Sequence, residues 1–451
     1  MTLTVGRQSA DSLDDEILAG LQVADAGAEQ PGAFKFDVAI VGLGYVGLPT
    51  ALSFSAAGLR VLGLDTSTAR VSAIREERVD LFQSDRERLG MALNDDSFTL
   101  TRDAGLLAEA ASVIVCVPTP VDDYLTPDLA ILRAACHTVV EHAVPGQVLI
   151  LTSTTYVGST RDMLVVPLAA RGLIAGRDIY VTFSPERIDP GNNRHAHEDV
   201  PRVVGGVTAE CTGRGVATLS GYARSLYSVS SAEAAEMTKL LENTFRAVNI
   251  AMINEFADAC RVLDLDVMEV IRAASTKPYG FMTFTPGPGV GGHCIPCDPR
   301  YLLWQLSRER LSTPVISRAM DGIAARPRHV VDRAREVLSS AGVALAGARV
   351  LVLGVAYKPN VEDIRESPAL EIAEGLIAAG AIVVYHDPLI ASMRLPGGHE
   401  LTSVADAALF DADLVIVHTL HRVMDRSWIE SARLILDTTY SLKSVPQLAS
   451  L

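Results

Sequence analysis

A glycine-rich turn between a short apolar run and a helical stretch is the feature that most constrains this chain. Residues 37–41 form the run, Gly42–Gly47 (GLGYVG) follows at once, and a helical pattern extends from Tyr45 to Ala57. In this setting the first glycine permits a tight turn, the second lets the backbone approach a pyrophosphate, and the third lets helix and strand pack closely. The turn therefore predicts a dinucleotide site at a helix N-terminus.

Asp65 adds a second element of the same site. It ends the next apolar run, 61–65, and follows Gly42 by 23 residues. A carboxylate at this position accepts hydrogen bonds from the adenosine ribose and repels a 2′-phosphate, which favours NAD over NADP. A tight turn without a ligand and an FAD site are the alternatives, but nothing further along the chain indicates a flavin.

Alternating strands and helices predict an α/β fold. Apolar runs at 112–117 and 147–151 continue the first series, and runs at 348–354, 382–385 and 413–417 form a second one without the three glycines. Strands separated by helices form parallel sheets with helices on both faces. We expect two Rossmann-like doubly wound domains, of which the second binds a different ligand.

A long helix is expected to join these domains. Residues 231–263 contain no Pro or Gly and have apolar side chains at helical spacing. Such a helix would be about 50 Å long, enough to link two domains or to pack against a partner subunit. We expect a homodimer through this helix.

Composition excludes several classes of function. The chain of 451 residues has a formal charge of −15, which argues against binding to nucleic acid. No apolar run reaches the roughly 18 residues that a membrane helix needs, and the N-terminus lacks the pattern of a secretory signal. We expect a cytoplasmic protein without a membrane segment. The six scattered cysteines predict reduced thiols.

The segment 286–299 (PGPGVGGHCIPCDP) is the densest in turn residues. Its four glycines permit close approach of the backbone to a ligand, and Cys294 would be a nucleophile as a thiolate. Cys294 and Cys297 also have the spacing of a redox pair or of half a zinc site, but further ligands at zinc spacing are missing. We expect no metal and an inert Cys297.

These motifs resemble those of the UDP-glucose, GDP-mannose and UDP-N-acetylhexosamine dehydrogenases. The resemblance extends from residue 36 to the end of the chain. It rests on eight ordered motifs: Val41–Pro49, Val117–Pro120, Ser153–Thr155, Phe183–Arg187, Lys239–Asn243, the cysteine loop, Ala356–Pro359 and Asp363–Pro368.

The resemblance implies NAD as cofactor and a nucleotide sugar, a UDP- or dTDP-hexose, as substrate. It implies cofactor contacts from Gly42, Gly44, Tyr45, Val46, Gly47, Asp65, Arg70, Thr119 and Arg365. It implies substrate contacts from Glu186, Lys239, Asn243, Gly291 and Lys358. The expected segments are an acidic disordered tail (1–33), an NAD-binding domain (34–225), a central helical and dimerisation domain (226–335) and a C-terminal nucleotide-sugar-binding domain (336–451).

The family chemistry is a four-electron oxidation of the hexose C6 alcohol to a carboxylate. By resemblance, Cys294 attacks the C6 aldehyde to form a thiohemiacetal, which is oxidised to a thioester and hydrolysed, while Asp298 handles protons and water. The implied catalytic residues are Cys294, Lys239, Asn243, Asp298, Thr154 and Glu186.

Lys239 and Asn243 lie one helical turn apart and, by resemblance, stabilise the oxyanion. Thr154 and Glu186 would position the hydrolytic water. Each residue also has a plain structural interpretation: Lys239 and Asn243 as a solvated helix face, Glu186 as a surface acid, and Arg365 as an ion-pair partner.

The sugar and the base stay open. Residues 276–281 and Ile295–Pro296 resemble the N-acetylhexosamine branch more than the UDP-glucose branch, and a dTDP-sugar of secondary metabolism is a further alternative. Two other functions are also compatible with parts of the sequence. One is a two-electron hydroxyacid or sugar-phosphate dehydrogenase, and the other is a non-catalytic NAD-responsive binding protein.

Overall fold

The chain divides into two units, Met1–Leu241 and Glu242–Leu451. The computed structural model describes residues 21–23 (backbone only), 34–79, 81, 83–122, 124–187, 197–292, 294–442 and 447–451. Of the predicted acidic tail, only strand β1 (Leu21–Val23) is among them. The rest of that prediction lies outside the described residues.

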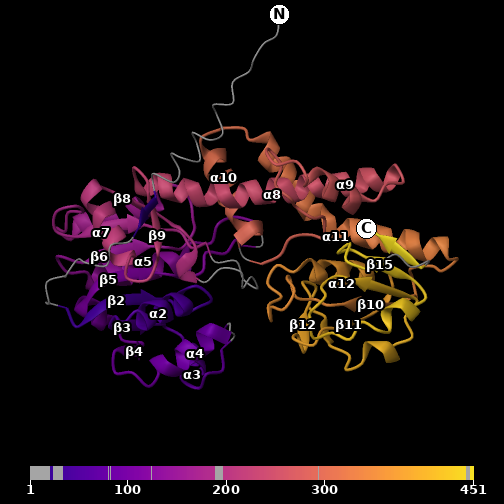
Figure 1. Cartoon of the computed structure of the whole chain (residues 1–451), viewed down its shortest axis with the longest axis horizontal. Helices are drawn as coiled ribbons and strands as arrows, with labels where there is room; N and C mark the ends of the chain where they lie inside the picture. The colour runs from indigo at the N-terminus through magenta and orange to yellow at the C-terminus, as the bar shows by residue number, and fades with distance from the viewer. Residues whose placement is uncertain are drawn as a thin grey trace, which may run out of the picture. The chain divides into compact units, whose positions relative to one another are not determined.

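Six parallel strands form the centre of the first unit's sheet, in the order β4-β3-β2-β5-β6-β7 (Figure 1). This is the order of a dinucleotide-binding fold, in which the direction of winding reverses between β2 and β5. β8 runs antiparallel to β7, and β9 and β1 extend that edge. The strands are β2 (Phe36–Val41), β3 (Val61–Leu64), β4 (Phe98–Thr101), β5 (Ala110–Val115), β6 (Val148–Leu151), β7 (Tyr180–Phe183), β8 (Arg202–Gly206) and β9 (Ser225–Ser228).

The helices of the first unit bury its apolar strands. Ile40 of β2 and Ile114 of β5 share a core with Leu52 of α2 and Leu219 of α7, as expected for strands covered on both faces. The helices are α2 (Gly47–Ala56), α3 (Thr68–Arg75), α4 (Gln83–Ala92), η1 (Ala104–Glu109), α5 (Ala130–His142), η2 (Arg161–Val165), α6 (Val166–Ala170), η3 (His197–Asp199) and α7 (Ala209–Leu219).

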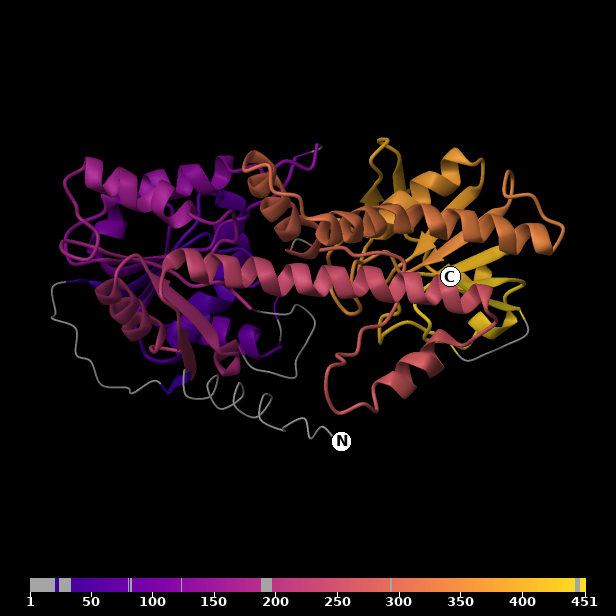
Figure 2. The ribbon, with the colours of Figure 1, turned by 90° about the horizontal axis from the view of Figure 1, so that it is seen from above.

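Helix α8 (Ala232–Val262) is unbroken over 31 residues (Figure 2). The predicted long helix is therefore confirmed, because this stretch has neither Pro nor Gly to interrupt it. The boundary between the two units falls within α8, between Leu241 and Glu242.

The second unit contains the other predicted sheet. Its five strands are all parallel, in the order β11-β10-β14-β15-β16, which is the second common doubly wound order. The strands are β10 (Arg349–Leu353), β11 (Ile382–His386), β14 (Leu414–Val417), β15 (Ile435–Asp437), β16 (Leu448–Ser450) and the hairpin β12 (Ser392–Arg394) with β13 (Glu400–Thr402).

Two apolar cores enclose this sheet. Helices α11 and α12 pack on one face, where Val331 and Ile372 meet Val350 of β10. On the other face Leu351 packs with Met424. The helices of this unit are α9 (Val267–Ala274), α10 (Cys294–Arg308), α11 (Pro314–Ser340), α12 (Pro368–Ala378), η4 (Ala407–Leu409) and η5 (Ile429–Ser431).

Candidate active site

The glycine turn after β2 requires glycine at its first and third positions. Gly42 has φ +89°, and a Cβ added to it would lie 2.7 Å from the carbonyl oxygen of Cys116. A Cβ on Gly47 would lie 1.8 Å from the carbonyl oxygen of Gly42. The two glycines therefore let α2 begin directly against the end of β2, at the point where the strand order reverses.

Gly44 differs, because a Cβ added to it would meet no described atom within 4 Å. Among the described residues, no side chain caps α2 at Val46. The open space at Gly44 and the amides of the first helical turn provide the environment that a pyrophosphate requires. The residues present thus fit a dinucleotide.

Asp65 and Arg70 hold the turn itself. The Asp65 carboxylate accepts hydrogen bonds from the amides of Leu43 and Ser67, both at 2.9 Å. Nε of Arg70 donates to the carbonyl oxygen of Leu43 at 2.8 Å. Asp65 was expected at the cofactor for its carboxylate and Arg70 by the family resemblance, and the structure adds the link of both residues to the turn backbone.

The loops after β5 and β6 are joined at the same edge of the sheet. Oγ of Ser153 accepts a hydrogen bond from the amide of Val117 at 2.9 Å and donates to the carbonyl oxygen of Val117 at 2.7 Å. Thr119 is buried and Thr154 is half-buried. The two expected threonines therefore belong to a pair of loops with a shared backbone anchor.

Glu186, three residues after the end of β7, forms a buried ion pair. Nη1 of Arg202 lies 2.5 Å from Oε2 of Glu186, and the amide of Arg187 donates to Oε1 at 2.7 Å. Burial alone would raise the pKa of Glu186, but the charge of Arg202, the nearby His197 and these hydrogen bonds lower it to about 2. Glu186 is therefore ionised at neutral pH and is not the surface acid of the plain alternative.

Arg202 is itself held in place by the protein interior. Its side chain is 4% exposed, its Nη2 donates to the carbonyl oxygen of Ser184 at 3.3 Å, and its guanidinium lies over the ring of Tyr222. Sequence reasoning did not identify Arg202. The available signal was a basic residue at the start of the otherwise apolar strand β8.

Glu236 fixes the N-terminal part of α8 to the loop after β6. Its carboxylate accepts hydrogen bonds from the amide of Thr160 at 2.8 Å, from the hydroxyls of Ser159 and Thr160 at 2.8 and 2.7 Å, and from the amide of Gly158 at 2.5 Å. Lys239 follows on the next turn and is buried. The solvated-face alternative for Lys239 is therefore wrong.

Asn243 and Asp298 form a buried pair in the second unit. The side-chain amide of Asn243 on α8 donates to Oδ2 of Asp298 on α10. Because a carboxylate only accepts, this bond orients the amide with its nitrogen toward Asp298 and leaves a second N–H on that nitrogen. Asn243 is also not part of a solvated face.

Cys294 is the first residue of α10 and is exposed, whereas Cys297 is buried. All six cysteines lie in the described part of the chain, and each is a thiol. Within the described residues, no group of three or more His, Cys, Asp or Glu side chains is arranged to hold a metal ion.

The glycines before Cys294 are needed for close packing against the protein itself. A Cβ on Gly291 would lie 2.6 Å from Cβ of Tyr357, and one on Gly292 would lie 2.8 Å from Cε2 of the same ring. The amide of Gly292 donates to the carbonyl oxygen of Arg365 at 2.9 Å. The loop was expected to bring its backbone close to a ligand, but the close approach in the structure is to Tyr357 and to the segment 365–368.

Arg365 forms an ion pair with Asp363 at 2.7 Å, as the plain alternative expected. The hydrogen bond and charge of Asp363 raise the pKa of Arg365 against the opposing effect of burial, and Tyr357 and Cys294 add smaller contributions in the same direction as Asp363. Lys358 is half-buried on the loop after β10.

The expected site residues occur in two groups, one in each unit of the chain. The first unit contains the glycine turn, Asp65, Arg70, Thr119, Thr154, Glu186 and Lys239, and the second contains Asn243, Gly291, Cys294, Asp298, Lys358 and Arg365.

Within the described ranges, no helix is long and apolar enough to span a bilayer.

Three models of the UDP-glucose/GDP-mannose dehydrogenase family match this chain: the NAD binding domain at residues 36–227, the central domain at 233–322 and the UDP binding domain at 351–444. The chain is 35% identical over 356 residues to Protein CapL of Staphylococcus aureus, covering 78% of this chain and 82% of CapL. It is 34% identical to a UDP-N-acetyl-D-mannosamine dehydrogenase of Pyrococcus horikoshii, covering 85% of this chain and 89% of the relative.

Solved structures agree with these matches. The structure of UDP-D-ManNAc dehydrogenase from Pyrococcus horikoshii superposes with a TM-score of 0.83 at 30% identity, covering 92% of this chain and 98% of that one. The chain belongs to the UDP-glucose/GDP-mannose dehydrogenase family, whose members are NAD-dependent nucleotide-sugar dehydrogenases. Its cofactor is NAD and its substrate is a nucleotide sugar.

Proposed function

We propose that this protein oxidises the C6 alcohol of a UDP-N-acetylhexosamine to a carboxylate in a four-electron reaction. The observation that carries this proposal is the exposed Cys294 at the start of α10, in the same unit as the buried Asn243–Asp298 pair. The names of the relatives supply the sugar, since they include UDP-N-acetyl-D-mannosamine and NDP-N-acetyl-D-galactosaminuronic acid dehydrogenases.

Cys294 is the proposed nucleophile. Its thiolate adds to the C6 aldehyde, so that a C–S bond forms and the carbonyl oxygen becomes an alkoxide. When bound, NAD accepts the hydride removed from C6 in each of the two oxidations. Water then adds to the thioester carbon, the C–S bond breaks, and the thiolate of Cys294 is regenerated with the carboxylate product.

Lys239 and Asn243 are proposed to stabilise the alkoxide. The ammonium of Lys239 is a buried positive charge, and the amide of Asn243 has a second N–H besides the one that donates to Asp298. Asp298 orients Asn243 and takes up or returns protons during addition and hydrolysis.

Glu186 and Thr154 are proposed to position the hydrolytic water. The pairing with Arg202 keeps Glu186 ionised, so its role is to accept a hydrogen bond from water and orient it. A carboxylate of such low pKa is a weak general base, and proton uptake is therefore left to Asp298.

The first unit is proposed to bind NAD at the carboxyl ends of β2 and β5. Tyr45, Val46 and the open position at Gly44 would face the pyrophosphate, Asp65 the ribose, and Thr119 the nicotinamide end. Arg70 and Arg365 are the two cations that we propose to assist in holding the dinucleotide.

The second unit is proposed to bind the uridine diphosphate part of the substrate at the carboxyl edge of its own sheet, where ligands of doubly wound folds bind. Lys358 supplies the positive charge and Gly291 the backbone surface. We propose the domain division 34–225, 226–335 and 336–451, in which the second and third segments together bind substrate.

The test is the stoichiometry of NADH. The protein is incubated with NAD and a panel of UDP-, dTDP- and GDP-linked hexoses and N-acetylhexosamines, and NADH is counted per sugar consumed. Two NADH per sugar and a uronate product are expected with a UDP-N-acetylhexosamine. One NADH per sugar would overturn the proposal in favour of a two-electron dehydrogenase. Normal uronate formation by Cys294→Ala would leave the four-electron reaction in place but refute Cys294 as its nucleophile.

A homodimer through α8 is the proposed assembly. Exposed apolar side chains recur along this helix at helical spacing: Leu241, Phe245, Met252 and Phe256. Exposed apolar side chains repeated at helical spacing are typical of a protein interface, and a second copy presents the same side chains. Sedimentation velocity of the full chain is expected to show a dimer, and Phe256→Glu is expected to shift it toward monomer.

A further inference from the structure

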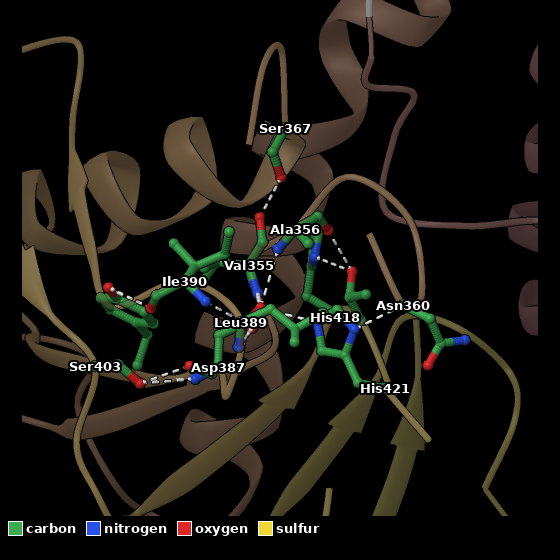
Figure 3. A network of polar contacts seen from close by, with 12 residues as sticks. Val355, Ala356, Asn360, Ser367, Asp387, Leu389, Ile390, Ser403, His418 and His421 are labelled. Atoms are coloured by element: carbon green, nitrogen blue, oxygen red, sulfur yellow. Dashed lines mark hydrogen bonds and ion pairs between the residues drawn. The ribbon is translucent and has the colours of Figure 1, made fainter. Parts of the chain in front are cut away.

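A buried aspartate lies at the carboxyl edge of the second unit's sheet and is absent from the proposed chemistry. Asp387 follows β11, is 2% exposed, and faces the loops after β10 and β14 (Figure 3). This edge is where we propose that the nucleotide binds. Nothing in the sequence motifs pointed to Asp387.

Asp387 joins three separate loops through hydrogen bonds. Its Oδ2 accepts from the amides of Val355 and Ala356 at 2.8 and 3.2 Å, and its Oδ1 accepts from the amides of Leu389 and Ile390 at 2.9 and 3.3 Å. Burial alone would raise its pKa, but the hydrogen bond from His421 and those from the backbone lower it. Asp387 is thus an ionised acceptor.

His421, on the loop after β14, connects Asp387 to the far end of the loop after β10. Its Nε2 lies 3.0 Å from Oδ2 of Asp387, and its Nδ1 lies 2.8 Å from the amide nitrogen of Asn360 (Figure 3). The amide of Asn360 can only donate, so Nδ1 must be the acceptor and Nε2 must carry the hydrogen that is donated to Asp387. The geometry therefore fixes the tautomer of His421.

The segment 355–360 is consequently fastened at both ends. Its first two residues are held by Asp387. Its last residue, Asn360, is held by His421 and by the amide of Arg422, which donates to Oδ1 of Asn360 at 2.8 Å. Asn360 also has φ +62°, a conformation in which Asn is tolerated better than most residues. Lys358 lies between these anchors.

We infer that Asp387 and His421 are positioning residues that hold the loop of Lys358 in the conformation that binds the nucleotide diphosphate. The inference rests on the proposed role of Lys358. Neither residue contacts the substrate in this arrangement, and both act through the backbone of one loop.

The directions of the hydrogen bonds favour this role over a purely structural one. Replacing a whole buried ion pair by well-packed apolar residues is often neutral or stabilising, so burial of such a pair is weak evidence for a role in stability alone. Here the charge and the ring are both directed at the amides of the loops, and the chain of contacts from Asp387 through His421 ends at Asn360, two residues after Lys358. Asp387 and His421 thus fix the backbone on both sides of Lys358, as the residues that support a binding site do.

Two substitutions at His421 separate its two hydrogen bonds. In His421→Gln the amide nitrogen reaches the place of Nε2 and keeps the donor to Asp387, but the acceptor for Asn360 is lost. In His421→Asn the side-chain oxygen takes the place of Nδ1 and keeps the acceptor for Asn360. UDP binding to the full chain, measured by calorimetry, is expected to weaken about fivefold to tenfold in His421→Gln and to stay within about twofold in His421→Asn.

The positioning role is also tested by hydrogen exchange of the loop, which requires no reaction, and by the KM values of a variant at Asn360. Hydrogen exchange of the peptide 355–360 in the protein without ligand is expected to be faster in His421→Gln than in His421→Asn. Asn360→Gly, at an exposed position that tolerates the positive φ, keeps the amide but loses the bond to Arg422, and is expected to raise the KM for the nucleotide sugar and to leave the KM for NAD unchanged.

The outcomes are distinct. Equal UDP affinity and equal exchange in His421→Gln and His421→Asn would overturn the positioning role, whatever the reaction proves to be. Weaker UDP binding by His421→Gln than by His421→Asn, together with no NADH from any UDP-sugar, would instead refute the proposed reaction and leave the positioning role in place.

Discussion

The guanidinium of Arg202 and the carboxylate of Glu186 form an ion pair with side-chain exposures of only 4% and 12%. Two charges at such burial stabilise each other mainly because each would be costly alone. The pair connects strand β8 to the motif after β7 and determines the ionisation state of a proposed water-positioning residue.

Replacing Arg202 with Met should destabilise the protein by about 3–5 kcal/mol, because it leaves the carboxylate of Glu186 buried without its partner. The free energy of unfolding is measured by urea denaturation. Arg214→Met is the matched control, since Arg214 forms an exposed helical pair with Glu210 and lies over the ring of Tyr180. It should change stability by about 1 kcal/mol or less. Adding Glu186→Gln to Arg202→Met should recover part of the loss. Similar stabilities of Arg202→Met and Arg214→Met would contradict the assigned burial.

Acid should remove the contribution of Glu186 to stability. Its pKa in the folded protein is about 2, below the ordinary value of 4.5, so the folded state binds its proton less readily than the unfolded state. The contribution is therefore fully present above the unfolded pKa and is lost as the pH falls toward 2. We expect the stability difference between wild type and Glu186→Gln to be constant well above pH 4.5 and to shrink as the pH falls from 4.5 toward 2. A difference that grows on acidification would show that the pKa is raised instead.

Iodoacetamide should alkylate Cys294 before any other cysteine of the native protein. Cys294 is exposed and the other five are buried, and burial raises the pKa of both Cys116 and Cys136 to about 12. Peptide mass spectrometry at partial modification identifies the site, and alkylation should abolish NAD reduction in proportion. Cys294→Ala serves as the control, in which native labelling should disappear. Early labelling of a buried cysteine would be inconsistent with the structure.

Gly47→Ala should lower the stability of the protein, whereas Gly44→Ala should lower its affinity for NAD. A Cβ at Gly47 overlaps the carbonyl oxygen of Gly42, whereas a Cβ at Gly44 meets no described atom. Gly47→Ala should therefore lower the melting temperature by several degrees, because α2 must move away from β2. Gly44→Ala should fold normally and weaken NAD binding, measured by calorimetry, since its methyl group occupies the proposed ligand space. Wild-type NAD affinity in Gly44→Ala would argue against a cofactor at this position.

Local patterns were sufficient to predict the parts of the fold that depend on neighbouring residues. The roles of Gly42 and Gly47, the unbroken α8 and the central strands of both sheets follow from spacing along a short stretch of chain. Such features are determined by backbone sterics and by helix or strand periodicity.

Long-range polar partners were not predictable in this way. Arg202 pairs with Glu186 across 16 residues, and His421 with Asp387 across 34. A single sequence shows these residues only as isolated charges, because their significance depends on which strands become neighbours. The glycines before Cys294 are an intermediate case: the need for close approach was predictable, but not that Tyr357 would be the neighbour.

The attachment of Glu236 to residues 158–160 also determines the rotational setting of α8. Successive helical residues differ by about 100° around the axis, so a slip of a single position would turn the Lys239 side chain away from its present face and break the hydrogen bonds of Glu236 together. The direction in which the Lys239 side chain projects from α8 is thus set by residues 158–160, which precede Glu236 by 76 positions or more.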